Sequence, residues 1–391
     1  MLYIIGGKIL TMAGDVWEKG YICIENGKIR ELGPMKDGAP FPLPEGEQVK
    51  VINALGYLIM PGLIEAHCHM GITEEKKGME GDDCNETVDP ITPYLRAIDA
   101  INPMDAAFDD ALRAGITSAM IGPGSANVVG GQFAFVKTHG RCIDRMIVKA
   151  PAAMKVAFGE NPKVNYSGQG TSPSTRMAIA AMLREELTKA AAYMKKREKN
   201  RDGEIDLRYE CWLPVLRGEI PLKAHAHRAD DILTAVRIAK EFHLRMTIDH
   251  CSEGHLVAED LKRAGFPAIV GPDMASRNKI EVQNMAFKTA GILSNYGILT
   301  AITTDHPVSK IQFLPICAGL AVKAGMAFEE GLRAITINAA RICGVANRVG
   351  SLAPGKDADI AVFTGNPMEI FTETLYTLID GKIVYDSQNQ K

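Results

Sequence analysis

The segment 58–69 constrains the fold more than any other stretch of this chain. It reads Leu-Ile-Met-Pro-Gly-Leu-Ile-Glu-Ala-His-Cys-His, an apolar run that ends in two histidines one residue apart. A strand that is apolar on both faces belongs in a sheet covered on both sides, which is typical of parallel sheets. Because side chains alternate along a strand, His67 and His69 share one face. The pattern predicts a buried strand whose carboxyl end carries two imidazoles.

Strand-like and helix-like runs alternate through the middle of the chain, which indicates βα units around a parallel sheet. Eight such units in about 290 residues match the size of a TIM barrel. The polar stretch 71–102 is too long for an ordinary connection, and we interpret it as an active-site loop. The expected strands are 58–69, 116–121, either 133–137 or 146–149, then 154–158, 220–225, 246–250, 268–270 and 299–305.

Both ends of the chain carry short strand-like runs separated by turns such as Asn26-Gly27 and Asp380-Gly381. Such pairs are hairpin signals. We therefore expect residues 1–56 and 353–391 to combine into one small domain beside a catalytic domain formed by 57–352. The predicted fold class is α/β, a (β/α)₈ TIM barrel with a small β-sandwich built from both chain termini.

Composition and charge exclude several classes of function. The chain has 391 residues, 46% hydrophobic and 23% charged, which is typical of a soluble protein with a large core. A formal net charge of -3 without a basic stripe argues against nucleic-acid binding. We find no signal-peptide pattern, and no run reaches the roughly 18 apolar residues of a membrane helix. The eight cysteines are scattered without a Cys-x-x-Cys motif, which predicts reduced thiols and a cytoplasmic location. The sequence does not decide the oligomeric state, and a homo-oligomer is compatible with it.

Polar side chains stand at the carboxyl ends of several predicted strands, which is where function lies in such barrels. Imidazole and carboxylate groups that converge in this way suit Zn²⁺ or a similar divalent ion. One histidine alone is more often structural, but a set of such side chains at several strand ends predicts a metal site. The candidate ligands are His67, His69, Lys155, His225, His250 and Asp305.

Taken together, these motifs resemble the amidohydrolase superfamily, over the whole chain. Within it, the chain is most similar to the imidazolonepropionase-like and Xaa-Pro-dipeptidase-like group. The resemblance implies a (β/α)₈ barrel, a β-sandwich from both termini, and one or two divalent metals that activate water. The motifs are His-x-His after Pro61-Gly62, a lysine on the fourth strand, histidines on the fifth and sixth strands, Thr303-Thr304-Asp305-His306, and the stretch 350–360, which looks like the return into the sandwich.

The resemblance also bears on the fourth strand. Superfamily members with two metals bridge them with a carbamylated lysine, and Lys155 stands at that position. A lysine must be neutral to add CO₂, and desolvation beside metal charge lowers its pKa accordingly. Glu160 is the alternative ligand, because other branches use a glutamate there. Strand alternation would place the two side chains on opposite faces, so only one should be a ligand, and we favour Lys155.

The family pattern favours His225 as the ligand on the fifth strand, which leaves His227 above the metal in contact with substrate or transition state. In the deaminase branch an acid follows this histidine by three residues. Here that position is Arg228, and Asp230 would restore the spacing only after a register shift.

Two further residues are candidates for substrate binding. Arg176 is expected either to bind a substrate carboxylate or to form a salt bridge at the start of its helix. His306 follows Asp305, and we expect it to contact substrate or to support the ligands from the loop.

The sequence therefore predicts a cytoplasmic, metal-dependent hydrolase that cleaves a C–N bond in a small molecule, either a cyclic amide or a small peptide-like amide. Asp305 is expected to take the proton of the attacking water and pass it to the leaving nitrogen. The first alternative is a mononuclear deaminase of the same fold. The second is a catalytically silent interaction protein of the same fold, against which the complete ligand set argues.

Overall fold

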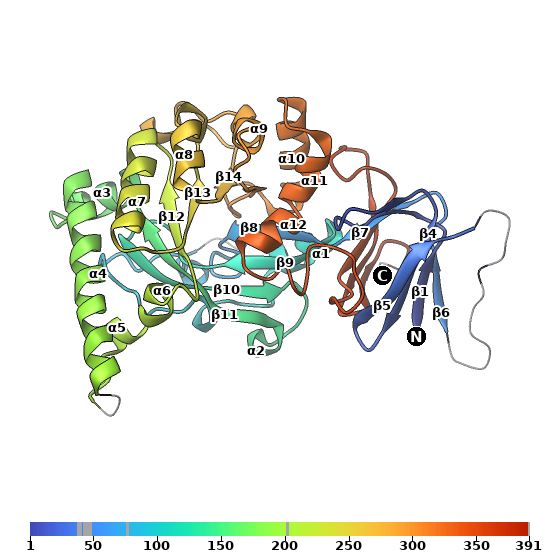
Figure 1. Ribbon diagram of the computed structural model, residues 1–391, viewed down its shortest axis with the longest axis horizontal. Coiled ribbons are helices and arrows are strands. Elements are labelled where there is room, and N and C mark those ends of the chain that lie inside the picture. The colour runs from blue at the N-terminus through green and yellow to red at the C-terminus, as the bar shows by residue number, and fades with distance from the viewer. Residues whose placement is uncertain (37–40, 42–48, 76–77, 201–202, 390–391) are drawn as a thin grey trace.

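Figure 1 shows the computed structural model, in which a barrel and its helices lie beside two sheets that hold both chain termini. The structure describes residues 1–36, 41, 49–75, 78–200 and 203–389. None of the helices in this part of the chain has the length and apolar character that crossing a membrane requires.

Eight strands form the barrel sheet in sequence order, and its first and last strands meet through the segment that follows the last one. There the Thr303 hydroxyl lies 2.6 Å from the main-chain oxygen of His67. This arrangement, with sheets from both termini beside it, confirms the predicted α/β class and barrel. The strands are β8 (Leu63–Cys68), β9 (Ile116–Ile121), β10 (Val129–Lys137), β11 (Ile147–Ala157), β12 (Leu222–Ala226), β13 (Met246–His250), β14 (Ala268–Val270) and β15 (Thr300–Ile302).

The expectation of eight uniform βα units is wrong at β10, which runs antiparallel to both of its neighbours. Only residues 122–128 separate it from β9. A connection that short returns the chain beside the strand it has left, whereas a parallel crossover needs a dozen or more residues. Both candidates for the third strand are therefore strand residues, since 133–137 lie in β10 and 147–149 begin β11.

Helices follow most of the barrel strands and cover the outside of the sheet (Figure 1). In α7, Ile232, Ala235, Val236 and Ala239 are buried at the three- and four-residue spacing of one helix face. The helices are α1 (Ala106–Arg113), α2 (Ile143–Met146), α3 (Glu160–Gly168), α4 (Arg176–Lys199), α5 (Leu207–Glu210), α6 (Leu213–Leu216), α7 (Ala229–Glu241), α8 (Ala258–Ala264), α9 (Lys288–Asn295), α10 (Leu314–Lys323), α11 (Phe328–Ala334) and α12 (Ile337–Ile342).

The terminal strands form two sheets that share one apolar core. Ile4 and Ile22 come from the first sheet, Ile59 and Ile360 from the second, and all four are fully buried. The first sheet has the order β5 (Lys28–Pro34), β4 (Gly20–Glu25), β1 (Leu2–Ile5), β6 (Lys50–Asn53), and the second β18 (Lys382–Asp386), β17 (Thr374–Ile379), β16 (Ile360–Phe363), β7 (Leu58–Pro61), β2 (Lys8–Leu10), β3 (Val16–Trp17).

The run 58–69, expected to be one barrel strand, is divided between the two parts of the molecule. Its first half, β7, pairs with β16 in the second terminal sheet, and only its second half, β8, enters the barrel. Gly62 separates the halves at a close approach, because a Cβ there would lie 2.2 Å from the Thr117 side chain. Pro61 has no N–H to donate to a ladder. The chain therefore changes sheets at this point.

A buried lysine joins the barrel to the terminal sheets. Lys137, at the end of β10, forms ion pairs with Asp357 at 2.9 Å and with Asp359, and lies 3.4 Å from Asp380. The side chains of Lys137, Asp357 and Asp359 are 6%, 0% and 2% exposed, respectively. Charges buried to this degree need each other, because an unpaired one is strongly destabilising.

Removing this lysine should weaken the junction. We expect Lys137→Met to lower the free energy of unfolding by about 3–5 kcal/mol, because it takes away the cation that faces the buried Asp359. Urea denaturation of the purified protein measures this change. Lys8→Met, which removes an exposed ion pair with Glu18, is the control and should cost less than about 1 kcal/mol. A Lys137→Met protein as stable as the wild type would show that the junction adds no stability.

Candidate metal centre

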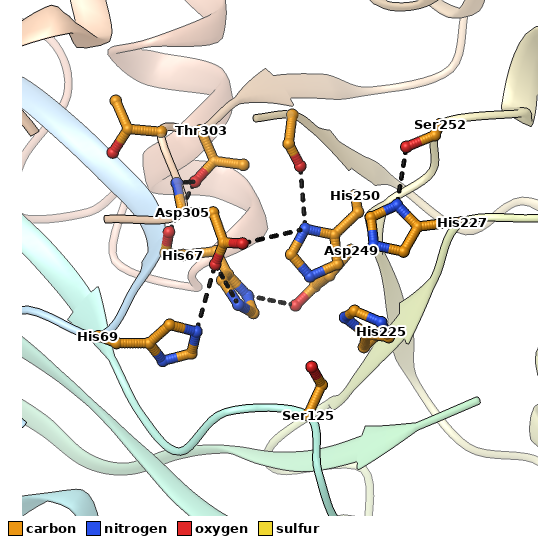
Figure 2. A network of polar contacts seen from close by, with 12 residues as sticks. His67, His69, Ser125, His225, His227, Asp249, His250, Ser252, Thr303 and Asp305 are labelled. Carbon is orange, nitrogen blue, oxygen red and sulfur yellow. Dashed lines mark hydrogen bonds and ion pairs between the residues drawn. The ribbon is translucent and has the colours of Figure 1, made fainter. Parts of the chain in front are cut away.

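Histidines from the ends of three strands, β8, β12 and β13, lie around one carboxylate, as Figure 2 shows. The Nε2 atoms of His67 and His69 lie 3.5 and 3.2 Å from Asp305 Oδ1. The other oxygen, Oδ2, lies 3.8 Å from His250 Nδ1. His67, His250 and Asp305 offer ligand atoms that all lie within 4.8 Å of one another, close enough to hold one metal ion. Asp305 thus stands at the meeting point of the first, sixth and eighth strands.

Contacts between Nδ1 and nearby oxygens hold three of the histidines in one orientation. In each of three imidazoles, Nδ1 lies within hydrogen-bond distance of an oxygen. This fixes the ring and leaves Nε2 as the free nitrogen, the usual arrangement behind a metal-ligating histidine. The contacts are His67 to Asp249 Oδ2 at 2.7 Å, His69 to the Gly122 oxygen at 2.7 Å, and His250 to the Gly271 oxygen at 2.9 Å.

A second group of possible ligands shares His250 with the first. The ligand atoms of His225, His227 and His250 also lie within 4.8 Å of one another. His225 Nδ1 is buried and has no hydrogen-bond partner in the described chain. A buried polar atom without a partner is costly, and a bound metal ion would satisfy it. His227, which the sequence predicts to lie above the metal, has its Nδ1 against the Ser252 hydroxyl at 2.8 Å and also lies within ligand range.

The protonation states of these side chains suit a metal. Burial lowers the pKa of His67, His225 and His250 well below the ordinary histidine value, so these imidazoles are neutral. Burial alone would raise the pKa of Asp305, but His250 and His69 lower it below its usual range. His69 differs, because burial lowers its pKa but Cys84 and Asp305 beside it raise the pKa overall to about 10. This imidazole would have to lose its proton to bind a divalent ion, since neutral imidazoles and ionised carboxylates are the forms that bind such ions.

Lys155 lies inside this cluster and Glu160 does not. The Lys155 side chain is fully buried, and its Nζ is 3.3 Å from His67 Nε2. Burial lowers its pKa to about 8, which makes the neutral amine accessible. Glu160 begins α3 and exchanges hydrogen bonds with Glu281, whose carboxylate accepts its main-chain N–H at 2.8 Å. Because β11 ends at Ala157, strand alternation does not extend to Glu160.

The two candidate substrate-binding residues lie outside the cavity that the histidines line. Arg176, the first residue of α4, forms an ion pair with Asp231 at 3.0 Å, the helix-start salt bridge of the two alternatives. It lines a separate cavity. His306 is fully buried, and its Nδ1 accepts the main-chain N–H of Ile311 at 3.2 Å. Its main-chain oxygen accepts the N–H of His69 at 2.8 Å, so it supports the segment that carries the ligands.

Two of the ligands adopt the left-handed backbone conformation, which is uncommon outside glycine. His250 has a φ of 72° and Asp305 a φ of 51°. Such residues cost on the order of 1–3 kcal/mol and cluster at functional sites. The sequence predicts that Asp305 ends a strand, but β15 stops at Ile302 and Asp305 lies in the following turn.

Sequence reasoning missed the buried charges that support the ligands. Glu65 lies two residues before His67, and Lys223 two before His225, so alternation places them on the ligand side of their strands. The sequence signal for these two residues is a charged side chain on the ligand face of an apolar strand. Asp249 carries no such signal, because it directly precedes His250 and strand alternation predicts that the two side chains face opposite ways. The left-handed φ of His250 turns the chain so that both side chains face the site.

Four of the histidine and aspartate side chains described above open into a cavity of about 390 Å³, which is the size of a small-molecule site. His69, His225, His227 and Asp305 line part of it, and polar and apolar residues from the surrounding segments line the rest. The long loop 71–102 contributes Asp82, Cys84 and Asn85 to this wall.

Comparison with known proteins agrees with this geometry. Residues 58–384 match the model of the amidohydrolase family. The amidohydrolase tasK of Hapsidospora irregularis is 29% identical over 95% of this chain, which spans 40% of that protein. A 5-methylthioadenosine/S-adenosylhomocysteine deaminase of Symbiobacterium thermophilum is 24% identical, over 98% of this chain and 93% of its own. An imidazolonepropionase of Sphingopyxis alaskensis is 24% identical, over 93% of this chain and 92% of its own.

The crystal structure of an amidohydrolase from Thermotoga maritima superimposes with a TM-score of 0.92 and 38% identity, covering 99% of this chain and 100% of that one. The family model extends over the barrel and over β7 and β16 to β18 of the second terminal sheet, and the Thermotoga maritima structure covers both terminal sheets as well. This chain belongs to the amidohydrolase family.

Proposed function

We propose that this amidohydrolase cleaves the C–N bond of a cyclic amide or of a small peptide-like amide. Membership in the family makes the chain a hydrolase that acts on carbon–nitrogen bonds, and the class of amide is our proposal. The observation that carries it is the position of Asp305, whose Oδ1 faces the Nε2 atoms of both His67 and His69 at the floor of the cavity.

The residues present fit one or two divalent metal ions. Zn²⁺ suits the combination of neutral imidazoles with a carboxylate. When bound, such an ion polarises the substrate carbonyl and lowers the pKa of water toward neutrality. The residues that would hold it are His67, His69, Lys155, His225, His250 and Asp305.

Asp305 is the proton carrier in this proposal. Its carboxylate is ionised and borders the cavity, so it can take a proton from the attacking water and return it to the leaving nitrogen. His227 borders the same cavity, and its Nε2 is free to contact the substrate carbonyl or the transition state. Lys155 would act as a carbamate, which its burial and the contact with His67 support.

The second candidate is a mononuclear deaminase, which the Symbiobacterium thermophilum relative favours by its name. A deaminase of this kind needs an acid close to the strand-five histidine. Asp230, which would serve after a register shift, forms a two-point ion pair with Arg228 at 3.0 Å and is about half exposed. An acid engaged at the surface is poorly placed to protonate a leaving amine, so we favour the amide hydrolase.

A cytoplasmic location belongs to the same proposal. All eight cysteines are free thiols in the structure, including Cys142, which is exposed. Free thiols persist in a reducing compartment.

Loss of one inner ligand should remove metal. We expect His69→Ala to lower metal affinity by more than about 100-fold, because outer supporting residues alone are typically worth about 10- to 100-fold. Elemental analysis of protein dialysed against a fixed metal concentration measures this loss. His139→Ala removes an exposed histidine outside the site and should keep the wild-type content. Full metal content in His69→Ala would contradict the assignment.

Asp305→Asn should abolish turnover while the protein stays folded, because an amide cannot accept the proton. General acid–base steps are worth about 10²–10⁴ in rate, and kcat should fall by at least that factor. The assay is hydrolysis of an active amide from a screen of lactams and dipeptides. Asp144→Asn, at an exposed position, is the matched control. Near-wild-type turnover of Asp305→Asn would exclude Asp305 as proton carrier.

The fourth-strand ligand can be identified by metal stoichiometry. We expect wild-type protein to bind two metal equivalents, and to need bicarbonate for reconstitution after stripping at low pH. Lys155→Ala should bind at most one, with partial rescue by acetate, which can refill the bridge. Glu160→Ala should keep both. The opposite pattern, in which Glu160→Ala loses a metal and Lys155→Ala keeps two without added carboxylate, would make Glu160 the ligand. A single metal in the wild type would favour the deaminase.

A further inference from the structure

Three polar side chains from separate segments form a connected chain on the wall of the cavity. Lys279 Nζ donates to Asn161 Oδ1 at 2.7 Å, and Asn161 Nδ2 donates to Ser125 Oγ at 2.7 Å. All three residues line the cavity together with the metal-binding histidines. Figure 2 shows Ser125 on its loop with the hydroxyl directed toward His225. This wall therefore faces whatever binds at the metal centre.

Lys279 and Ser125 each keep one hydrogen-bond donor free on this wall. An ammonium group has three N–H donors, and in the described chain the contacts of Lys279 use two, one to Asn161 and one to Glu281. The Ser125 hydroxyl accepts from Asn161 and keeps its own hydrogen to donate. The amide of Asn161 spans the two donors, with its oxygen on the ammonium and its nitrogen on the hydroxyl.

A buried carboxylate holds the lysine in place. Glu281 is 1% exposed, and its Oε1 lies 2.5 Å from Lys279 Nζ. Its other oxygen accepts the main-chain N–H of Glu160 at 2.8 Å, which ties the loop of Lys279 to the start of α3. The Lys279 side chain is 25% exposed, so it is anchored at one end and open to the cavity at the other. A donor fixed in this way loses little conformational entropy when it binds a ligand.

We propose that Lys279 and Ser125 form a carboxylate subsite, so that the substrate is an amide bearing a carboxylate close to the bond that is cleaved. The inference rests on the proposed amide hydrolysis and adds the substrate class to it. Two adjacent donors, one of them cationic, match the two oxygens of a carboxylate. A neutral carbonyl would use only one of them. A phosphate group presents three strong acceptor oxygens, one more than the two free donors of this wall.

The test compares pairs of amides that differ only in the carboxylate. 5-Oxoproline and 2-pyrrolidinone are one such pair, and glycyl-proline and glycyl-prolinamide are a second. Affinity for each compound is measured by isothermal titration calorimetry with metal-loaded protein, and hydrolysis is followed separately. Binding and turnover thus give independent readouts, so the subsite can fail while amide hydrolysis stands, and the reverse.

We expect the wild type to bind the carboxylate member of a pair at least ten-fold more tightly. A hydrogen bond between charged groups is worth a factor of about 10–100, so Lys279→Met should bring that ratio close to one. Ser125→Ala should lower it by a smaller factor, and Lys279→Arg should keep part of it. Lys288→Met, which removes an exposed lysine at the start of α9, should keep the wild-type ratio.

Lys279→Met leaves Glu281 buried without its cation and could fail to fold. The double variant Lys279→Met/Glu281→Gln removes both charges and is measured beside it. A wild type without preference for the carboxylate members overturns the subsite, whether or not the amides are hydrolysed. An unchanged preference in the folded double variant and in Ser125→Ala also overturns it. A Lys279-dependent preference without hydrolysis of any amide supports the subsite and contradicts the proposed reaction.

Discussion

A single buried carboxyl group, that of Glu65, joins the first barrel strand to the segment after the last one and sets the position of Asp305. One oxygen accepts the N–H of Thr304 at 2.9 Å and its hydroxyl at 2.7 Å, and the other contacts the Thr303 hydroxyl at 2.5 Å. The Asp305 N–H in turn donates to that hydroxyl at 3.0 Å. Burial raises the pKa of Glu65. In its protonated form it would donate to Thr303, whose own hydrogen would then serve the His67 oxygen, so every group in the chain is satisfied.

A buried ion pair also supports the histidines. Asp249 accepts from Lys223 at 3.0 Å and holds His67 at 2.7 Å, and the lysine also donates to the Ala66 oxygen at 3.1 Å. Both charges are fully buried, and breaking such a pair leaves an uncompensated charge in a low-dielectric interior. The pair, which lies on β12 and β13, therefore fixes the ring of His67 from across the barrel. A site that carries left-handed residues at His250 and Asp305 needs support of this kind, because strained conformations persist only where their surroundings determine them.

The sequence predicts the barrel, the terminal sheets and the ligand positions because each depends on local pattern. Apolar runs mark strands, and a histidine or aspartate at the end of such a run marks the functional face. The direction of β10, in contrast, does not follow from the pattern of its own residues. Its apolar residues would suit a parallel strand equally well, and only the short connection 122–128 separates the two cases. The division of 58–69 at Gly62 depends on the approach of Thr117, a residue 55 positions away in the chain. The first feature depends on the length of one connection and the second on a contact between distant residues, and neither is marked by a pattern of residue types.

The change of sheet at Gly62 also connects the terminal sheets to the candidate metal centre. β7 is held by β16, where Met60 pairs with Ala361, and the chain then runs through Gly62 into β8 and on to His67 and His69. The Gly62 N–H donates to the oxygen of Asp359, the residue that also meets Lys137 of the barrel. The candidate ligands His67 and His69 are thus at the end of a strand that is anchored at its start by the second terminal sheet. A shift of that sheet against the barrel would displace β8, and with it His67, His69 and the Glu65 carboxyl group that positions Asp305 through Thr303. The terminal sheets act through the covalent chain as a fixed support for one half of the site.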